Sequence, residues 1–137
     1  MAAQILVSRS SVQAVRYLLD TNVVIGLLGG QAASVALVKA ANCQLAEMAV
    51  SQITRLELLG FAGIGADGAQ TIESFLSSIK VLPISAEVEA QVIALRQGRK
   101  IKLPDAIVAA TALAHGLELL TLDVSLARSF QVLTQND

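Results

Sequence analysis

Apolar and polar positions along the chain alternate between short apolar runs of strand length and longer stretches of helical length. The short runs are rich in Leu, Val and Ile and predict strands at Tyr17–Leu19, Leu45–Val50, Val81–Ile84, Leu119–Leu122 and Gln131–Thr134. The longer stretches are rich in Ala and Leu and predict helices at Gln31–Ala41, Gln52–Ala62, Ala69–Ile79, Ala86–Gln97 and Asp105–His115. Alternating strands and helices indicate βαβ units. The pattern therefore predicts an α/β fold, a three-layer α/β/α sandwich around a small, mostly parallel sheet.

Residues at the ends of these segments support the predicted helices. Ser51 stands where an N-cap belongs, Pro104 suits the first turn of its helix, and Gly116 suits the position just after it. No repeat, low-complexity segment or long linker divides the chain. We expect one domain over residues 1–137, with residues 1–15 as a poorly ordered N-terminal extension.

Composition narrows the class of protein. Of the 137 residues, 54% are hydrophobic and only 15% are charged, which excludes an intrinsically disordered chain. The one cysteine cannot form an internal disulfide bond. The longest uncharged stretch, Thr21–Val38, is too polar and too rich in glycine to predict a membrane span, and residues 1–15 lack the apolar core of a signal peptide. We expect a soluble protein in the cytoplasm whose surplus of apolar residues is buried against another subunit or a partner.

The net charge of −1 excludes a nucleic-acid binder that works through bulk positive charge. It leaves open a metal-assisted enzyme that acts on an anionic substrate, because the metal ion would supply the missing positive charge. The acidic residues are therefore the informative ones.

Four acids stand in apolar surroundings. Asp20 and Asp123 follow predicted strands, whose carboxyl ends meet at the edge of a parallel sheet where ligands gather. Asp105 opens one predicted helix and Glu57 lies in the second turn of another, and both helices are expected to begin at that edge. Clustered carboxylates repel one another unless a cation lies among them. Ligation by oxygen alone is what Mg²⁺ or Mn²⁺ prefers.

Each acid taken alone also has a purely structural explanation. Asp105 stabilises the N-terminus of its helix through the helix dipole. Asp20 and Asp123 follow strands, where aspartate often forms turns. Glu57 is explained equally well as a solvated helix residue. Only the combination of all four at one edge favours a metal site.

Four segments, in this order, resemble the motifs of the PIN-domain nucleases, and most closely the VapC-type toxins of bacterial toxin–antitoxin modules. They are Tyr17-Leu-Leu-Asp20-Thr21-Asn22, Ser51 with Leu56-Glu57-Leu58, Leu103-Pro104-Asp105-Ala-Ile-Val-Ala-Ala-Thr111, and Leu120-Thr121-Leu-Asp123. The similarity covers the chain from Arg16 to its end.

The resemblance implies a PIN-like fold and a metal-dependent endoribonuclease. The matching acids Asp20, Glu57, Asp105 and Asp123 would hold Mg²⁺ or Mn²⁺ and activate the water that attacks the RNA phosphodiester. Thr121 would position water or phosphate, and Asn22 would orient Asp20 or the water shell of the metal. Toxins of this kind form homodimers, and a cognate antitoxin protein silences them from a hydrophobic groove near the site.

A basic run directly precedes the segment that contains Asp105. It comprises Arg96, Arg99, Lys100 and Lys102, with no acid between them. In a nuclease these side chains would hold RNA phosphates. A charge run is also typical of a solvated loop between two helices.

Two alternatives to a nuclease remain. Gly63, Gly65 and Gly68 match the pattern G-x-G-x-x-G of a small dinucleotide-binding module, but that function requires a strand directly before Gly63. The residues in that place, Gln52–Ala62, are predicted to be helical. The second alternative is a non-catalytic protein-interaction domain that keeps only the PIN-like fold.

Overall fold

A four-stranded parallel sheet forms the middle layer of the protein. The computed structural model describes residues 15–135, so the predicted N-terminal extension lies outside the described residues except for Val15. The strands lie in the order β3-β2-β1-β4, and all three pairings are parallel. Their bounds are β1 (Tyr17–Leu19), β2 (Met48–Ser51), β3 (Lys80–Leu82) and β4 (Glu118–Leu120).

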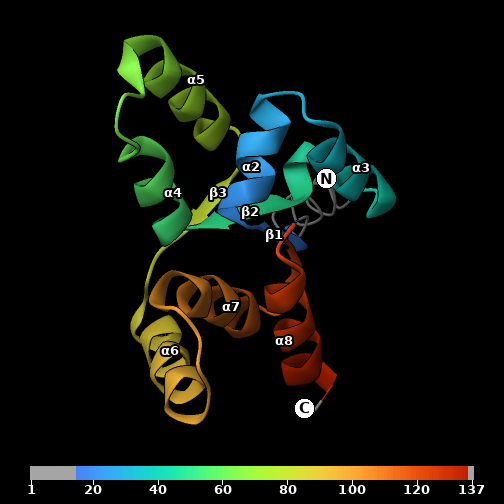
Figure 1. Ribbon diagram of the computed structural model, residues 1–137, viewed down its shortest axis with the longest axis vertical. Helices are drawn as coiled ribbons and strands as arrows, with labels where there is room; N and C mark the ends of the chain where they lie inside the picture. The colour runs from blue at the N-terminus through green and yellow to red at the C-terminus, as the bar shows by residue number, and fades with distance from the viewer. Residues whose placement is uncertain (1–14, 136–137) are drawn as a thin grey trace, which may run out of the picture.

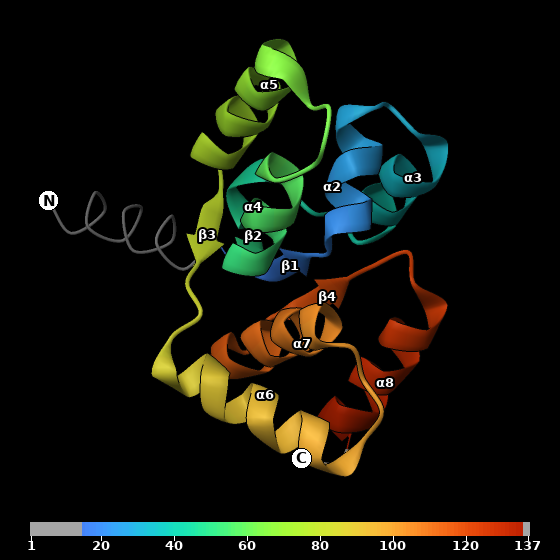
Figure 2. The same ribbon diagram turned by 60° about the vertical axis from the view of Figure 1, so that its left-hand side comes forward.

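Helices cover both faces of this sheet, with α2 to α5 on one face and α6 to α8 on the other (Figures 1 and 2). Their bounds are α2 (Thr21–Leu28), α3 (Ala32–Ala40), α4 (Gln52–Leu59), α5 (Gly65–Ser77), α6 (Ala86–Gly98), α7 (Leu103–His115) and α8 (Val124–Gln135), and η1 (Leu45–Glu47) is a short 3₁₀ helix. The predicted three-layer α/β/α class is confirmed.

The alternation of side chains along β1 explains why both faces need cover. Tyr17 and Leu19 pack into the cluster under α2 to α5, whereas Leu18 packs into the cluster under α6 to α8. All three side chains are buried. A parallel strand buried on both faces is apolar at every position, which is what the sequence Tyr17-Leu18-Leu19 shows.

Helix α7 is the most deeply buried helix described. Every residue from Ala106 to Ala112 is buried, and four of these seven are alanines. Small side chains allow the helix to lie close to both the sheet and α6. Pro104 lies in its first turn, and Gly116 ends it in the left-handed conformation with φ of 65°, as the sequence predicts.

The predicted elements need correction near the start and near the end of the chain. Residues Gln131–Thr134 form the last turns of α8 and are not a strand, because Leu126, Phe130 and Leu133 recur at helical spacing and pack into the core cluster beside α7. Helix α2 was not predicted, since Val23, Val24 and Ile25 are β-branched. Burial of Val23 and Val24 under the sheet overrides that local preference.

The predicted strand Leu45–Val50 is half correct. Its first three residues form η1, and the strand begins only at Met48. Glu47 accepts a hydrogen bond from the backbone N–H of Gln44 at 2.9 Å, which closes a tight turn there. The apolar pattern alone did not reveal this polar contact.

The glycine motif does not follow a strand, so the dinucleotide-binding hypothesis is wrong. Helix α4 ends at Leu59, and Gly63 lies in the loop that joins it to α5. Gly63 and Gly65 have φ of 82° and 71°, a left-handed conformation that glycine adopts without strain. These glycines shape a connection between two helices.

Cys43 lies in the core beneath α2 to α5 with 7% of its surface exposed. Burial, and then the nearby charge of Glu47, raise the pKa of its thiol to about 11. The thiol is therefore protonated at neutral pH.

Within residues 15–135 no single helix is both long enough and apolar enough to span a membrane. Helices α2 and α3 reach that length and apolar character only when taken together, and they meet at a bend of 113°.

The contact between α2 and α3 depends on a glycine. A Cβ atom at Gly26 would lie 1.8 Å from the Ser34 Oγ and 2.6 Å from its Cβ. We predict that Gly26→Ala lowers the free energy of unfolding by about 2 kcal/mol through overpacking. The double variant Gly26→Ala/Ser34→Gly should recover part of the loss. The measurement is urea unfolding, with Gly98→Ala, where the added Cβ meets nothing within 4 Å, as the control. Equal stability of Gly26→Ala and Gly98→Ala would contradict the prediction.

Candidate functional site

The sheet brings Asp20 and Thr121 together at its carboxyl edge. Strands β1 and β4 are neighbours, and Leu19 pairs with Leu120. The ladder continues one step further, because the backbone N–H of Asp20 donates to the Leu120 carbonyl at 2.9 Å. The residues that follow the two strands are therefore adjacent, although a hundred positions separate them in the sequence.

The Asp20 carboxylate is buried, with 7% of the residue exposed, and both of its oxygens accept hydrogen bonds. Oδ1 accepts from the backbone N–H of Thr21 at 2.8 Å, which makes Asp20 the N-cap of α2. Oδ2 accepts from the Thr121 hydroxyl at 2.7 Å. These bonds fix the carboxylate while one further lone pair on each oxygen stays free for a ligand.

Thr121 connects two of the four acids. Its hydroxyl donates to Asp20 and accepts from the backbone N–H of Asp123 at 3.0 Å. Asp123 in turn accepts from the backbone N–H of Leu126 at 3.1 Å and so caps the start of α8. Thr121 thus holds the Asp20 carboxylate directly and the backbone of Asp123 beside it.

Glu57 reaches the same edge from α4. The Thr21 hydroxyl donates to Glu57 Oε1 at 2.6 Å and lies 3.0 Å from the Thr54 hydroxyl. Thr54 is fully buried, whereas Glu57 is exposed. Neither threonine was identified from the sequence as a site residue. The signal was present, because Thr21 follows Asp20 directly and Thr54 lies one helical turn before Glu57.

The pKa of Asp105, in the first turn of α7, depends on the charges of the other three acids. Burial raises the pKa of its carboxyl, and the negative charges of Asp20 and Asp123 raise it further. Lys102 lowers it, and Glu57 adds a smaller upward effect. Within residues 15–135 no hydrogen bond or ion pair to the Asp105 side chain is formed. The four predicted acids therefore share one electrostatic environment.

Asn22 makes a different contact from the one that the resemblance implies. Its Oδ1 accepts a hydrogen bond from the backbone N–H of Leu122 at 3.2 Å. This bond ties α2 to the connection between β4 and α8. Asn22 therefore holds in place the segment that carries Thr121 and Asp123.

The four carboxylates meet at one edge but do not form a closed metal cage. No three His, Cys, Asp or Glu side chains of the described residues are arranged to hold one metal ion. The donors are nevertheless all oxygens with negative charge. Mg²⁺ commonly binds through only one or two carboxylates and keeps several waters. The donor set therefore fits this kind of ion better than one that needs a complete cage.

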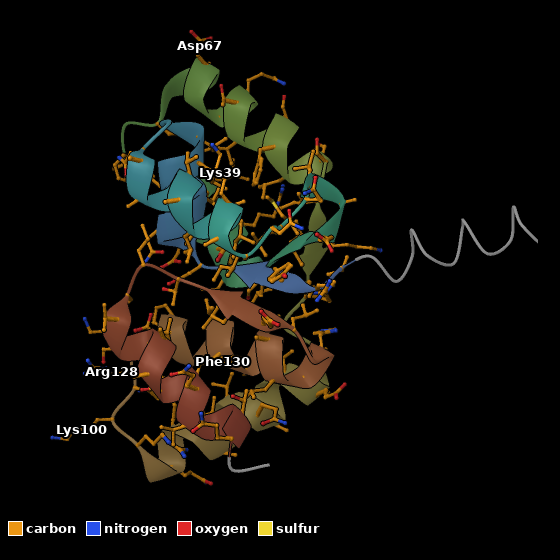
Figure 3. All side chains as sticks on the ribbon, turned by 90° about the vertical axis from the view of Figure 1, so that its right-hand side faces the viewer. Lys39, Asp67, Lys100, Arg128 and Phe130 are labelled. Carbon is orange, nitrogen blue, oxygen red and sulfur yellow. The ribbon has the colours of Figure 1, made fainter. Side chains whose placement is uncertain are left out.

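The basic run divides into two parts. Arg99, Lys100 and Lys102 line a cavity of about 330 Å³ together with Asp105 and Asp123. The Lys100 side chain extends outward from the loop between α6 and α7 (Figure 3). Arg96, in the last turn of α6, is exposed and does not line this cavity.

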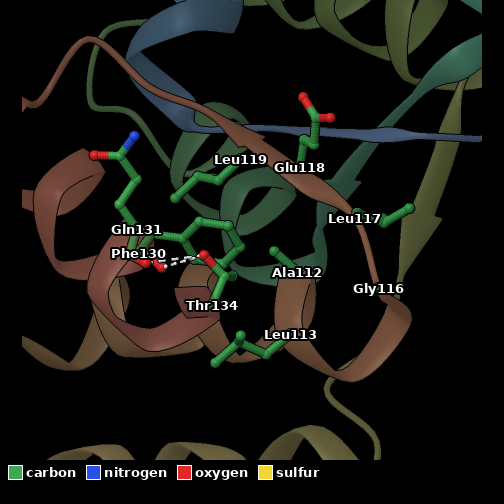
Figure 4. A pocket seen from close by; sticks show the side chains of 9 residues that line it. All are labelled: Ala112, Leu113, Gly116, Leu117, Glu118, Leu119, Phe130, Gln131 and Thr134. Carbon is green, nitrogen blue, oxygen red and sulfur yellow. Dashed lines mark hydrogen bonds between the residues drawn. The ribbon is translucent and has the colours of Figure 1, made fainter. Parts of the chain in front are cut away.

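A larger cavity, of about 540 Å³, lies away from the acids. Figure 4 shows its lining, which includes Leu113 of α7, Glu118 at the start of β4 and Phe130 of α8. It opens at the amino ends of the strands, opposite the carboxyl edge. None of the four acids lines it.

Comparison with known proteins identifies the family. The PIN domain matches residues 17–129. The chain is similar to a solved toxin–antitoxin complex from Klebsiella pneumoniae, with 37% identity, a TM-score of 0.66, and coverage of 77% of this chain and 84% of that chain. It is also similar to FitAcB from Neisseria gonorrhoeae, with 28% identity, a TM-score of 0.68, and coverage of 84% and 93%. No curated protein matches the chain in sequence.

The chain therefore belongs to the PIN-domain family, a family of nucleases, as its motifs predict. The matched range begins at the first residue of β1 and extends into α8. It thus contains all four acids, the basic loop, and Thr21, Thr54 and Thr121.

The raised pKa of Asp105 has a consequence for stability. The folded protein binds this proton more tightly than the unfolded chain, so the free energy of unfolding falls as the pH rises through the interval that starts near 4. Without divalent ions, we predict that Asp105→Asn raises the melting temperature at pH 7, and that the gain disappears below that interval. Asp67→Asn, an exposed acid on α5, is the control for thermal unfolding between pH 3 and pH 8. A difference independent of pH would contradict the prediction.

Proposed function

We propose that the protein is a metal-dependent endoribonuclease and the toxin of a toxin–antitoxin module. One observation carries the proposal: carboxylates from four segments of the chain gather at the carboxyl edge of a PIN-domain sheet, where the Thr121 and Thr21 hydroxyls donate hydrogen bonds to Asp20 and Glu57. Such a concentration of negative charge destabilises the fold unless it serves a cation. Asp20, Glu57, Asp105 and Asp123 are the proposed metal-holding residues.

The proposed cofactor is Mg²⁺ or Mn²⁺, which suits oxygen donors. When bound, such an ion polarises the phosphoryl group, makes water a stronger nucleophile and stabilises the leaving oxygen. Thr121 holds the Asp20 carboxylate through its hydroxyl and fixes the backbone of Asp123. Thr21 donates to the Asp20 carboxylate through its N–H and to the Glu57 carboxylate through its hydroxyl.

The proposed RNA contacts are the basic residues beside Asp105. Arg99, Lys100 and Lys102 line the same cavity as Asp105, so a phosphate that they hold lies next to the acids. A local cluster of this kind binds an anionic chain although the protein as a whole carries a net charge of −1. It also offsets the repulsion between the acids and the RNA.

The proposed partner is an antitoxin that docks beside Glu57. The solved structure from Klebsiella pneumoniae is a toxin–antitoxin complex, and the one from Haemophilus influenzae is VapBC-1. Here a small, mostly apolar groove of about 180 Å³ has Ile25, Phe61 and Ile64 in its lining, together with Glu57. Phe61 is 68% exposed and Ile25 is 52% exposed. A partner seated there would block the way to the acids.

A homodimer and a cytoplasmic location complete the proposal. Exposed apolar side chains outside the groove, among them Leu45, Ile84 and Ile93, supply surface that a second copy would bury. Light scattering coupled to size-exclusion chromatography measures the mass of the isolated protein and tests the dimer.

Cleavage of RNA tests the catalytic residues. With Mg²⁺ or Mn²⁺, we predict that the protein cuts single-stranded RNA and that Asp20→Asn and Asp105→Asn each reduce the rate at least about 100-fold. Thr121→Val should lose about 10- to 100-fold, because the Asp20 carboxylate loses a hydrogen-bond donor and the backbone N–H of Asp123 loses its acceptor, while Thr121→Ser keeps the hydroxyl and most of the activity.

Folding of each variant is checked by circular dichroism, and EDTA should stop cleavage by the wild type. Asp67→Asn, at the far tip of α5 in Figure 3, serves as the control and should cleave normally. Cleavage that survives EDTA would refute the metal requirement, and cleavage of DNA alone would refute the proposed substrate. No cleavage of either, with no stabilisation by divalent ions, would favour the non-catalytic interaction domain.

Partner binding tests the apolar groove. We predict that Phe61→Ser weakens binding of the antitoxin, the small protein expected to be encoded beside this chain, by about 30-fold or more, as loss of a central aromatic contact does. Val132→Ser removes an apolar side chain that is 51% exposed on α8 and is the control. Calorimetry with the purified partner measures both. Equal affinity of the two variants would place the interface elsewhere.

A further inference from the structure

The cavity beside the acids has two walls from different parts of the chain. One wall is the loop between α6 and α7, which contributes Arg99 to Lys102. The other wall is α8, which contributes Ser125, Ser129 and Leu133. Figure 2 shows this loop rising from the end of α6 toward the start of α7, with α8 beside it. The cavity is therefore a slot between a basic loop and a helix face.

The helix wall carries hydroxyl groups at regular spacing. Ser125 and Ser129 are four residues apart and so lie on the same face of α8, with Leu133 one turn further on. Leu126 and Ile101 add apolar lining to the two walls. Hydroxyl groups next to apolar surface suit a flat ring that has apolar faces and a polar edge.

The electrostatics of the slot change along its length. Arg99, Lys100 and Lys102 give it positive charge on the loop side, whereas Asp105 and Asp123 stand where it meets the carboxyl edge. A ligand that fills the slot therefore has the proposed reaction site at one end and cations along one side. This polarity matches an RNA chain whose scissile phosphate lies at the acids.

We propose that this slot takes one unpaired nucleotide next to the phosphate that is cut, and that Ser125 and Ser129 select its base. The inference rests on the proposed nuclease function and adds a preference for the base at one position beside the cut, set by residues of α8. Its volume of about 330 Å³ lies near the lower end of the range for small-ligand sites and suits a single nucleotide.

The lining explains both the selection and its limits. A serine hydroxyl both donates and accepts a hydrogen bond, so two of them read the pattern at the edge of a base. No aromatic side chain lines the slot, so the faces of the base contact Leu126, Ile101 and Leu133 without stacking. A base inside an RNA duplex has its edge paired and cannot enter, whereas an unpaired base can turn outward.

Filling the slot tests the inference. Ser129→Leu places an apolar side chain in it, and Ala127→Leu adds similar bulk on an exposed position of α8 that does not line it. Cut sites in a pool of random single-stranded RNA are mapped by sequencing. We expect the wild type and Ala127→Leu to share a preference at one position beside the cut, and Ser129→Leu to lose it with about a tenfold lower rate. Ser125→Ala and Ser129→Ala should change which base is preferred while the cut continues.

A binding measurement separates recognition from cleavage. Fluorescence anisotropy in EDTA, with Asp105→Asn as the background, compares a preferred oligonucleotide with the same strand lacking the base at the selected position. We expect loss of the base, and with it of its hydrogen bonds to the serines, to weaken binding about tenfold, and to have no further effect when Ser129→Leu is added.

The outcomes distinguish the two proposals. If the wild type cuts RNA and Asp105→Asn does not, but Ser129→Leu keeps both rate and preference, the nuclease stands and the nucleotide slot is refuted. Equal cleavage of duplex and single-stranded RNA would refute it as well. If the wild type cuts no RNA, the proposed function and the slot fall together.

Discussion

The buried carboxylate of Asp20 constrains the whole carboxyl edge of the sheet. A charge removed from water must have hydrogen-bond partners, because an unpartnered one would cost several kcal/mol. Thr21 and Thr121 supply these partners from two elements that only the parallel pairing of β1 and β4 brings together. The fold therefore holds Asp20 in place only when helix α2 begins at once after β1 and Thr121 directly follows β4.

The same constraint accounts for the neighbours of Asp20. Thr121 also accepts from the backbone N–H of Asp123, so the start of α8 is set by the same hydroxyl that holds Asp20. On the other side, the hydroxyl of Thr21 holds Glu57 of α4. Thr21 and Thr121 thus link the buried carboxylate of Asp20 to the Glu57 carboxylate and to the backbone of Asp123, while Asp105 approaches from α7.

Much of the fold follows from the sequence because both faces of the sheet are buried. Strand β1 is apolar at each position, and α7 carries alanines where it approaches the sheet, so pattern and packing agree. They disagree at Gln131–Thr134, where Val132 and Thr134 favour a strand but Phe130 and Leu133 pack at helical spacing. The helix prevails there because contacts distant in sequence outweigh local preference.

The sequence predicts the four acids of the candidate site from their type and their places after strands and near the starts of helices. The family motif adds Thr121 and Asn22. The roles of Thr21 and Thr54 depend on distances between side chains 33 and 36 positions apart, which no local pattern encodes. The place of Ser125 and Ser129 in the cavity was not predictable either, because that face of α8 lines a cavity only where the basic loop lies opposite it.

Cys43 has a practical consequence that follows from its place beneath α2 to α5. With a pKa of about 11, only about one thiol in ten thousand is a thiolate at pH 7, and the thiolate is the form that reacts with oxidants and alkylating reagents. A cysteine introduced on an exposed helix would react far sooner. Fluorescent or spin labels can therefore be attached at chosen surface positions without first removing the natural cysteine.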